Sequence, residues 1–190
     1  MVTTHTFEDR LRTIRHAQDA GMSVCAGGIL GLGEKGADRL RMLEVLSNFN
    51  PQPESVPINA LMAIKGTPMQ ENERVDSFEF IRMIALARIA MPRAKVRLSA
   101  GRTQMSKEAQ ALAFFAGANS IFYGDKLLTA ANPRANEDLA LLRALGLAAQ
   151  APNPDLEAPA PDFSKSMSPQ PDGCVMMTEE AVHACGCGDL

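Results

Sequence analysis

The sequence predicts an α/β fold, namely a partial TIM-type (β/α)8 barrel that contains the last four βα units. Helical and strand-like patterns alternate up to about residue 148, and four strand-like runs have apolar residues on one face and polar residues on the other. Parallel strands are usually apolar on both faces, so a polar face indicates a lined cavity. A complete barrel typically needs about 250 residues. A small doubly wound sheet is the alternative, but it would require apolar residues on both faces.

The first unit is predicted to begin with a helix and to continue into a strand. Thr6 and Asp9 form a capping-box pattern at the start of the helix, and Gly21 is a suitable stop. A strand over residues 22–25 follows and is predicted to open into a glycine-rich turn over residues 27–33.

The second and third units repeat this pattern. A helix over about residues 37–49 ends at a segment with two prolines, and a strand over residues 55–59 follows. After a loop, Asp76 and Glu79 form a capping-box pattern for a helix over about residues 77–91.

The fourth unit contains the two remaining strands. A strand over residues 96–99 precedes a helix that begins after Ser106 and stops near Gly117. A strand over residues 119–123 and a short helix over about residues 137–145 then complete the alternation.

Composition narrows the class of protein. With 190 residues and a formal net charge of −3, the chain has no basic surface for nucleic acid and no polybasic membrane patch. Its apolar runs are too short to span a membrane, and four cysteines make no disulfide framework in a chain of this length, which favours a cytoplasmic location. We expect residues 1–148 to form the barrel domain and the proline-rich residues 149–190 to form a flexible tail.

Three residues on the polar faces are candidates for chemistry. Cys25 ends a strand, where barrel enzymes carry their sites, and could ligate a soft metal, although a free cysteine is more often a small buried hydrophobe. Asn59 could hold a ureido or carboxamide group, or it could cap the strand end. Arg97 must be paired if it is buried, either as a carboxylate clamp or in a structural ion pair.

Two further segments allow more than one interpretation. The Ser-Ala-Gly-Arg segment over residues 99–102 could form an anion-binding turn. In the tail, His183, Cys185 and Cys187 could bind zinc or a cluster, but no second cysteine pair completes a set of four ligands. The alternative for these three residues is an exposed, oxidisable terminus.

Four segments, taken together, resemble the biotin synthase family. They read VCAGGILGLGE at 24–34, ESVPIN at 54–59, VRLSAGR at 96–102 and AGANSIFYG at 116–124. The resemblance runs in order from about residue 4 to residue 147, and four long motifs in order are more specific than any one of them.

This resemblance implies a radical S-adenosylmethionine enzyme with a (β/α)8 barrel, which inserts sulfur into dethiobiotin to form biotin through a 5′-deoxyadenosyl radical. It also implies two cofactors besides S-adenosylmethionine. These are a [4Fe–4S] cluster that reduces S-adenosylmethionine and a [2Fe–2S] cluster deep in the barrel that donates sulfur. The family is homodimeric.

The resemblance assigns roles near the [2Fe–2S] cluster to four residues of this chain. Cys25 would be the last of three cysteine ligands of the cluster, and Arg97 would be its unusual fourth ligand. Ser55 and Ser120 would lie near the cluster.

Three more residues would contact the small molecules. Asn59 would contact the ureido ring of dethiobiotin, and Ile29 and Met62 would flank the adenine of S-adenosylmethionine.

One departure from the family pattern bears on activity. The family binds its [4Fe–4S] cluster with C-x-x-x-C-x-x-C, which this sequence lacks, as it lacks the first four strands. We therefore expect the C-terminal half of the enzyme, starting at an internal Met1 and inactive alone. It would act with an N-terminal half-barrel chain, or it would be a non-catalytic remnant or binding module that retains part of the dethiobiotin pocket.

Overall fold

The computed structural model describes residues 4–122 and 135–150 of the chain. Four parallel strands form one sheet in the order β1-β2-β3-β4. They are β1 (Gly28–Leu30), β2 (Ser55–Ala60), β3 (Lys95–Leu98) and β4 (Ser120–Ile121). The predicted alternation of helices and parallel strands is confirmed, and sequential strands are neighbours throughout, as in a barrel wall.

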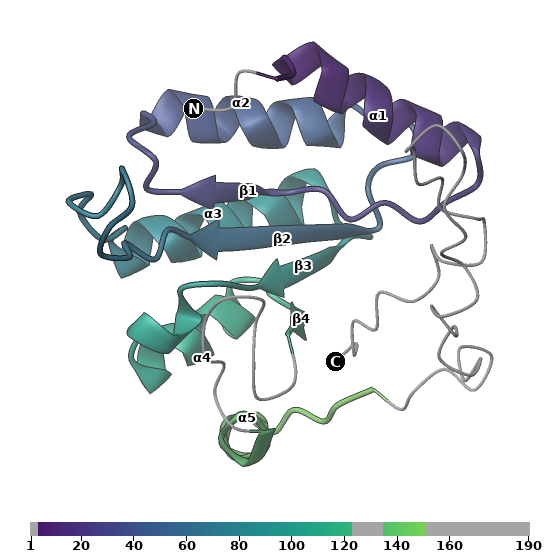
Figure 1. Cartoon of the computed structure of the whole chain (residues 1–190). Helices are drawn as coiled ribbons and strands as arrows, with labels where there is room; N and C mark the ends of the chain where they lie inside the picture. Colours follow the sequence, from purple (N-terminus) through teal and green to yellow (C-terminus); the bar gives the residue numbers. More distant parts are fainter. Residues whose placement is uncertain (1–3, 123–134, 151–190) are drawn as a thin grey trace, which may run out of the picture.

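Five α-helices connect and flank the strands. They are α1 (Phe7–Asp19), α2 (Gly36–Ser47), α3 (Ser77–Ala90), α4 (Lys107–Phe115) and α5 (Ala135–Ala144), and a short 3-10 helix η1 (Arg102–Gln104) follows β3. Figure 1 shows α2 beside β1, α3 behind the sheet and α4 below β3, with α5 at the bottom of the view. Because α2 packs on α3 and α3 packs on α4, these helices form one continuous outer layer.

The hydrophobic core lies between the sheet and this outer layer. Val56 and Ile58 of β2 and Val96 and Leu98 of β3 are fully buried, and each pair is in register across the two strands. Helix α3 contributes most to the opposite side of the core through Phe80, Met83, Ile84 and Ala87. The alternation along β2 and β3 therefore directs one face of each strand into a closed apolar layer.

The helix ends follow the predicted signals. Thr6 and Asp9 form a complete capping box on α1. Asp76 caps α3 by accepting hydrogen bonds from the N–H groups of Phe78 and Glu79, which is the Asp76 half of the predicted capping box. Ser106 accepts from the N–H of Ala109 at the start of α4.

The prediction for the first strand was wrong in position. Cys25 makes only an isolated bridge with Ser55, and β1 occupies residues that we expected to form a glycine-rich turn. Parallel pairing with β2 explains the difference, because Gly28 lies opposite Ile58 and its lack of a side chain makes room for the Met42 sulfur. A Cβ at Gly28 would lie 2.1 Å from that sulfur.

The last two elements differ from expectation by a few residues. Strand β4 spans only Ser120–Ile121, and α5 begins at Ala135. Within the described ranges, no helix is long and apolar enough to cross a membrane. The predicted tail from residue 149, with His183, Cys185 and Cys187, lies almost entirely outside the described residues, so the division at residue 148 stays a prediction.

Candidate functional site

The strand register brings the predicted polar residues to one face of the sheet, which we call the inner face. Cys25 pairs with Ser55, Pro57 pairs with Arg97, and Arg97 pairs with Ser120. Since side chains alternate along a strand, these positions lie opposite the helix-packed residues. The inner face is defined by Cys25, Ser55, Asn59, Arg97, Ser99 and Ser120.

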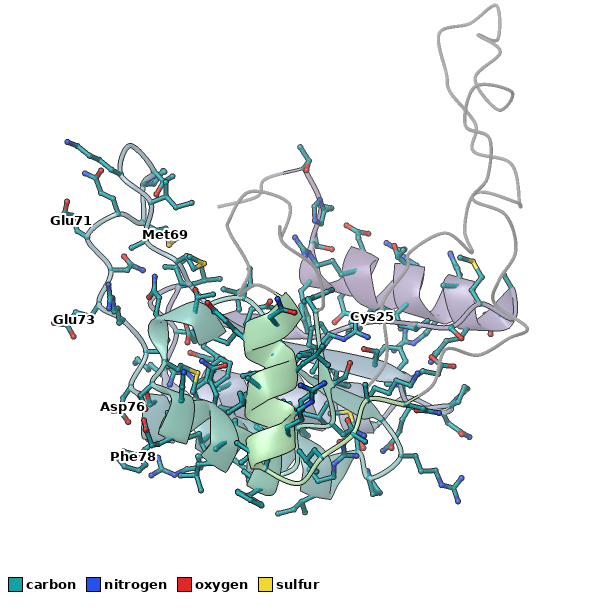
Figure 2. The ribbon with its side chains drawn as sticks, turned by 90° about the horizontal axis from the view of Figure 1, so that it is seen from below. Cys25, Met69, Glu71, Glu73, Asp76 and Phe78 are labelled. Atoms are coloured by element: carbon teal, nitrogen blue, oxygen red, sulfur yellow. The ribbon has the colours of Figure 1, made fainter. Side chains whose placement is uncertain are left out.

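Cys25 lies at the amino end of the sheet, not at the carboxyl end that we expected. Ser55 is the first residue of β2, and two backbone hydrogen bonds, Ser55 N–H to Val24 O and Ala26 N–H to Ser55 O, hold Cys25 beside it. Figure 2 shows Cys25 apart from Met69 and Glu71, which belong to the loop after β2. Any group bound by Cys25 would therefore lie deep below the carboxyl-end loops.

The Cys25 side chain is exposed, so its interpretation as a small buried hydrophobe is wrong. The preceding residue, Val24, points to the core with 8% exposure. The thiol is thus available to a ligand.

Arg97 is almost fully buried, with 2% exposure, although it lies on the polar face. Its Nε–H donates to Ser120 Oγ at 3.0 Å, and its Cζ lies 4.9 Å from the centre of the Phe122 ring. The ring face provides a favourable surface for a planar cation that has lost water. These contacts connect β3 to β4 and fix the direction of the guanidinium.

The Asn59 side chain connects β2 to the first residue of β1 and to the segment that follows β3. Its Nδ2 donates to Gly28 O at 3.1 Å, and its Oδ1 accepts from the Ala100 N–H at 3.2 Å. The structure therefore places this amide as a brace across β1, β2 and the end of β3, which is the strand-capping role. Contact with a ureido group would have to use the remaining hydrogen-bonding capacity of the same amide.

Two serine hydroxyls are buried on the inner face. Ser55 and Ser99 are 8% and 2% exposed, and neither Oγ has a hydrogen-bond partner among residues 4–122 and 135–150. A buried hydroxyl without a partner costs free energy, so these two atoms indicate that the inner face is built to meet another group. Ser55 is the register neighbour of Cys25, which places one of these hydroxyls beside the thiol.

Ile29 and Met62 lie near the carboxyl end of the sheet. Ile29 is 49% exposed and pairs with Asn59, and Met62 is half-buried just after β2. The Leu61 N–H donates to Leu30 O at 2.8 Å, which joins the two chain segments that carry these residues. The exposed apolar surface of Ile29 is suited to cover a flat ligand.

The carboxylate of Glu34 holds the turn after β1, a role that the sequence did not predict. Glu34 accepts hydrogen bonds from the N–H groups of Gly31 and Leu32 at 2.8 and 2.7 Å, and from Arg39 Nε at 2.7 Å. Partial burial would raise the pKa of Glu34, but the Gly31 N–H and the Arg39 guanidinium outweigh it and hold the pKa below 4.5. Gly31 has φ +96°, a left-handed conformation that favours glycine.

A buried ion pair was also missed. Arg102, at the start of η1, donates to both carboxylate oxygens of Asp138 on α5 at 2.6 and 2.7 Å, and both side chains are at most 3% exposed. Its Nη2 also donates to Phe122 O at 3.2 Å. Arg102 of the Ser-Ala-Gly-Arg segment therefore already binds a carboxylate of the same chain, and anion binding by the rest of this turn stays a prediction. No local signal connects two residues 36 positions apart.

A search for metal-binding groups gives an incomplete set. Within residues 4–122 and 135–150, no three His, Cys, Asp or Glu side chains come together. Cys25 and Arg97 lie two strands and two register positions apart, so their backbones are separated by about 12 Å, given about 4.8 Å between strands and about 3.3 Å per residue. One thiol, one guanidinium and an unpartnered hydroxyl on one face fit part of a cluster site, and further ligands would have to be added.

Comparison with solved structures defines the fold. The chain resembles the structure titled HydG, a maturase of the [FeFe]-hydrogenase, with a TM-score of 0.64 and 20% identity over 77% of this chain and 35% of that one. It also resembles methylornithine synthase (PylB), with a TM-score of 0.62 and 18% identity over 78% of this chain and 47% of that one. The fold is thus a partial α/β barrel.

Comparison of sequences then identifies the family within this class. The profile of the Biotin and Thiamin Synthesis associated domain matches residues 57–148. Biotin synthase from Prochlorococcus marinus (strain AS9601) is 59% identical over 147 residues, which are 77% of this chain and 44% of that protein. Biotin synthase from Flavobacterium johnsoniae is 58% identical over 152 residues, or 80% of this chain and 42% of that protein.

The chain is therefore similar in sequence to biotin synthases, and its similarity is consistent with the C-terminal part of those proteins. It spans less than half the length of these curated relatives.

Proposed function

We propose that this chain supplies the C-terminal wall of a biotin synthase, an enzyme that inserts sulfur into dethiobiotin. The observation that carries the proposal is the 59% identity over 147 residues, a stretch long enough to cover nearly all of the described structure. The inner face supports it independently, because a half-closed sheet with buried polar groups and an exposed thiol is suited to enclose reactive chemistry.

Cys25 and Arg97 would hold a [2Fe–2S] cluster from one side. The thiol of Cys25 would bind as thiolate, and the guanidinium of Arg97, already directed inward from β3, would approach from the other side. Ser55 and Ser120 would line the same region, and Ser55 Oγ would gain the hydrogen-bond partner that the described chain does not provide. The iron–sulfur clusters and S-adenosylmethionine would supply the radical and sulfur chemistry when bound.

The carboxyl end of the sheet would bind the small molecules. The side-chain amide of Asn59 would position the ureido ring of dethiobiotin and would keep its hydrogen bonds to the Gly28 and Ala100 backbone. Ile29 and Met62 would cover the adenine of S-adenosylmethionine, and the turn held by Glu34 would leave room for it. The chain's own groups would thus bind, orient and exclude water.

We infer that activity requires the rest of the barrel. The sequence has no C-x-x-x-C-x-x-C segment, and Cys25, the one cysteine among residues 4–122 and 135–150, cannot complete a cluster site by itself. A second portion of the enzyme, as a separate chain or as preceding sequence, would supply the missing ligands and close the inner face. A non-catalytic module that keeps part of the dethiobiotin pocket is the competing hypothesis.

Anaerobic reconstitution with iron and sulfide tests the proposal. The chain is combined with the part of the Prochlorococcus marinus relative that it does not cover, and iron, sulfide and visible absorbance are measured. We expect a [2Fe–2S] spectrum that Cys25→Ala abolishes and that the matched control Cys185→Ala retains. An unchanged spectrum in Cys25→Ala would contradict the cluster role.

The chain alone gives the complementary result. After the same treatment, we expect no [4Fe–4S] cluster and no cleavage of S-adenosylmethionine. Four bound irons together with production of 5′-deoxyadenosine would refute the requirement for a second portion.

A further inference from the structure

We propose that Phe122, together with the buried Arg102–Asp138 pair, positions the Arg97 guanidinium on the inner face. The inference deepens the proposed function and rests on it, because Arg97 is the residue expected to approach the cluster. It assigns positioning roles to Phe122, Arg102 and Asp138, to which the family resemblance gave no role.

The positioning contacts form a continuous series that begins at Asp138 on α5. Asp138 binds Arg102 through both carboxylate oxygens, and Arg102 in turn donates from Nη2 to the backbone carbonyl of Phe122. That carbonyl lies directly after β4, so this hydrogen bond fixes the backbone that carries the Phe122 ring. The ring lies under the Arg97 guanidinium, with 4.9 Å between Cζ and the ring centre.

Arg97 is held by Ser120 of β4 and by Phe122, the residue that follows this strand. Ser120 accepts from its Nε–H on one side, and the Phe122 ring covers the guanidinium plane. Ser120 and Phe122 are two residues apart, and both contact the Arg97 side chain. A long arginine side chain has many rotamers, and these two contacts together restrict the direction of its guanidinium.

The backbone that precedes Arg102 packs closely against β2. Ala60 N–H donates to Ala100 O at 2.8 Å, and Gly101 has φ +91° with Ala60 so close that an added Cβ would lie 2.6 Å from the Ala60 Cβ. Only glycine allows β2 and the end of β3 to approach in this way. Contacts with β2 therefore fix the backbone that leads into Arg102. The hydrogen bond from Arg102 Nη2 in turn fixes the backbone at Phe122.

The competing explanation is that Arg102 and Asp138 only anchor α5 to the barrel wall. Both explanations predict a loss of stability when the pair is broken. Only the positioning role predicts a change at Arg97 itself, so the test must observe that guanidinium directly.

The experiment measures hydrogen exchange and chemical shift of arginine Nε–H groups by NMR in the full 190-residue chain, without any cluster. Arg97 should give a slowly exchanging Nε–H signal shifted by the Phe122 ring. Arg88, whose Nε–H donates to Gly117 O at 3.0 Å on the helix side, is the internal reference. Absence of a protected Arg97 signal in the unmodified chain would overturn the proposal.

Substitutions at Phe122 and Asp138 test the ring contact and the buried ion pair separately. In Phe122→Leu, the ring-dependent shift of Arg97 should disappear and its Nε–H should exchange about tenfold faster, while Phe122→Tyr should keep both. In Asp138→Asn, Arg97 exchange should also rise about tenfold with Arg88 unchanged. If Asp138→Asn alters only Arg102 signals, or if it alters Arg88 as much as Arg97, the pair is an anchor and the positioning role is refuted.

Phe122→Leu leaves the Arg102–Asp138 pair in place, so it tests the ring contact even if Asp138→Asn fails to fold. The readout needs no iron. A protected and ring-shifted Arg97 with no cluster spectrum after reconstitution would contradict the proposed function alone, whereas a normal cluster with an unprotected Arg97 would contradict only this inference.

Discussion

The two faces of the sheet differ in the kind of side chain that they bury. On the helix side, Val56, Ile58, Val96 and Leu98 are fully buried in an apolar layer supplied by this chain. On the inner face, a buried arginine and buried hydroxyls lie beside an exposed thiol. The helix side thus stabilises the fold, while the inner face buries polar groups at a cost in free energy. Such a cost is expected where the buried groups serve function.

The largest effect is expected where charge is most deeply buried. Asp138→Asn leaves the Arg102 guanidinium without its carboxylate and should lower the free energy of unfolding by about 3–5 kcal/mol. Urea unfolding of this variant and of the neighbouring, exposed Glu137→Gln measures the difference. A loss no larger than the control's, within about 0.5 kcal/mol, would show that the pair is not a structural requirement.

Truncation of one apolar side chain on each face tests which face contains the core. Leu98→Ala removes a fully buried side chain from the core and should cost about 2–5 kcal/mol of unfolding free energy. Ile29→Ala removes a half-exposed side chain from the inner face and should cost less than about 1 kcal/mol. Equal costs in chemical denaturation would contradict the assignment of the core to one face.

A smaller effect is expected at the turn after β1, and it depends on pH. The folded state holds the pKa of Glu34 below 4.5, so its carboxylate stabilises the fold above that value and loses this contribution as pH falls further. Glu34→Gln should lose about 1 kcal/mol at pH 7 and should flatten the stability profile below pH 4.5. Glu44→Gln, at an exposed position, is the control, and identical acid profiles for all three proteins would refute this.

The smallest change in stability is expected at a buried hydroxyl. Ser55→Ala removes an Oγ that has no partner in the described chain, so the free energy of unfolding should stay within about 0.5 kcal/mol or rise. Ser120→Ala removes the acceptor for Arg97 Nε and should cost about 1–3 kcal/mol. Thermal unfolding of the two serine variants checks the contrast, and a larger loss for Ser55→Ala would mean that its hydroxyl already has a partner.

Local patterns predicted much of the fold. The alternation of polar and apolar residues in 55–59 and 96–99 identified β2 and β3 and also which residues share a face, because side-chain direction depends only on position along the strand. The caps at Thr6, Asp76 and Ser106 were found for the same reason, since each capping contact spans two or three residues.

What the sequence alone did not predict depends on contacts between distant segments. Strand β1 was missed because its pairing with β2 outweighs the weak strand preference of glycine. The position of Cys25 at the amino end of the sheet depends on the same register. The Arg102–Asp138 pair and the backbone contacts of Asn59 join residues that only the tertiary fold brings together. The roles of Cys25, Arg97 and Asn59 toward cofactors and substrate stay predictions.

The central claim is that thiol, amide and guanidinium groups of successive strands share the inner face. A spin label on Cys25, in a chain with Cys174, Cys185 and Cys187 changed to serine, tests it by paramagnetic broadening of side-chain NMR signals. We predict strong broadening of the Arg97 Nε–H and Asn59 amide signals, with Arg88 on the helix side much less affected. Broadening of Arg88 equal to or greater than that of Arg97 would contradict the claim.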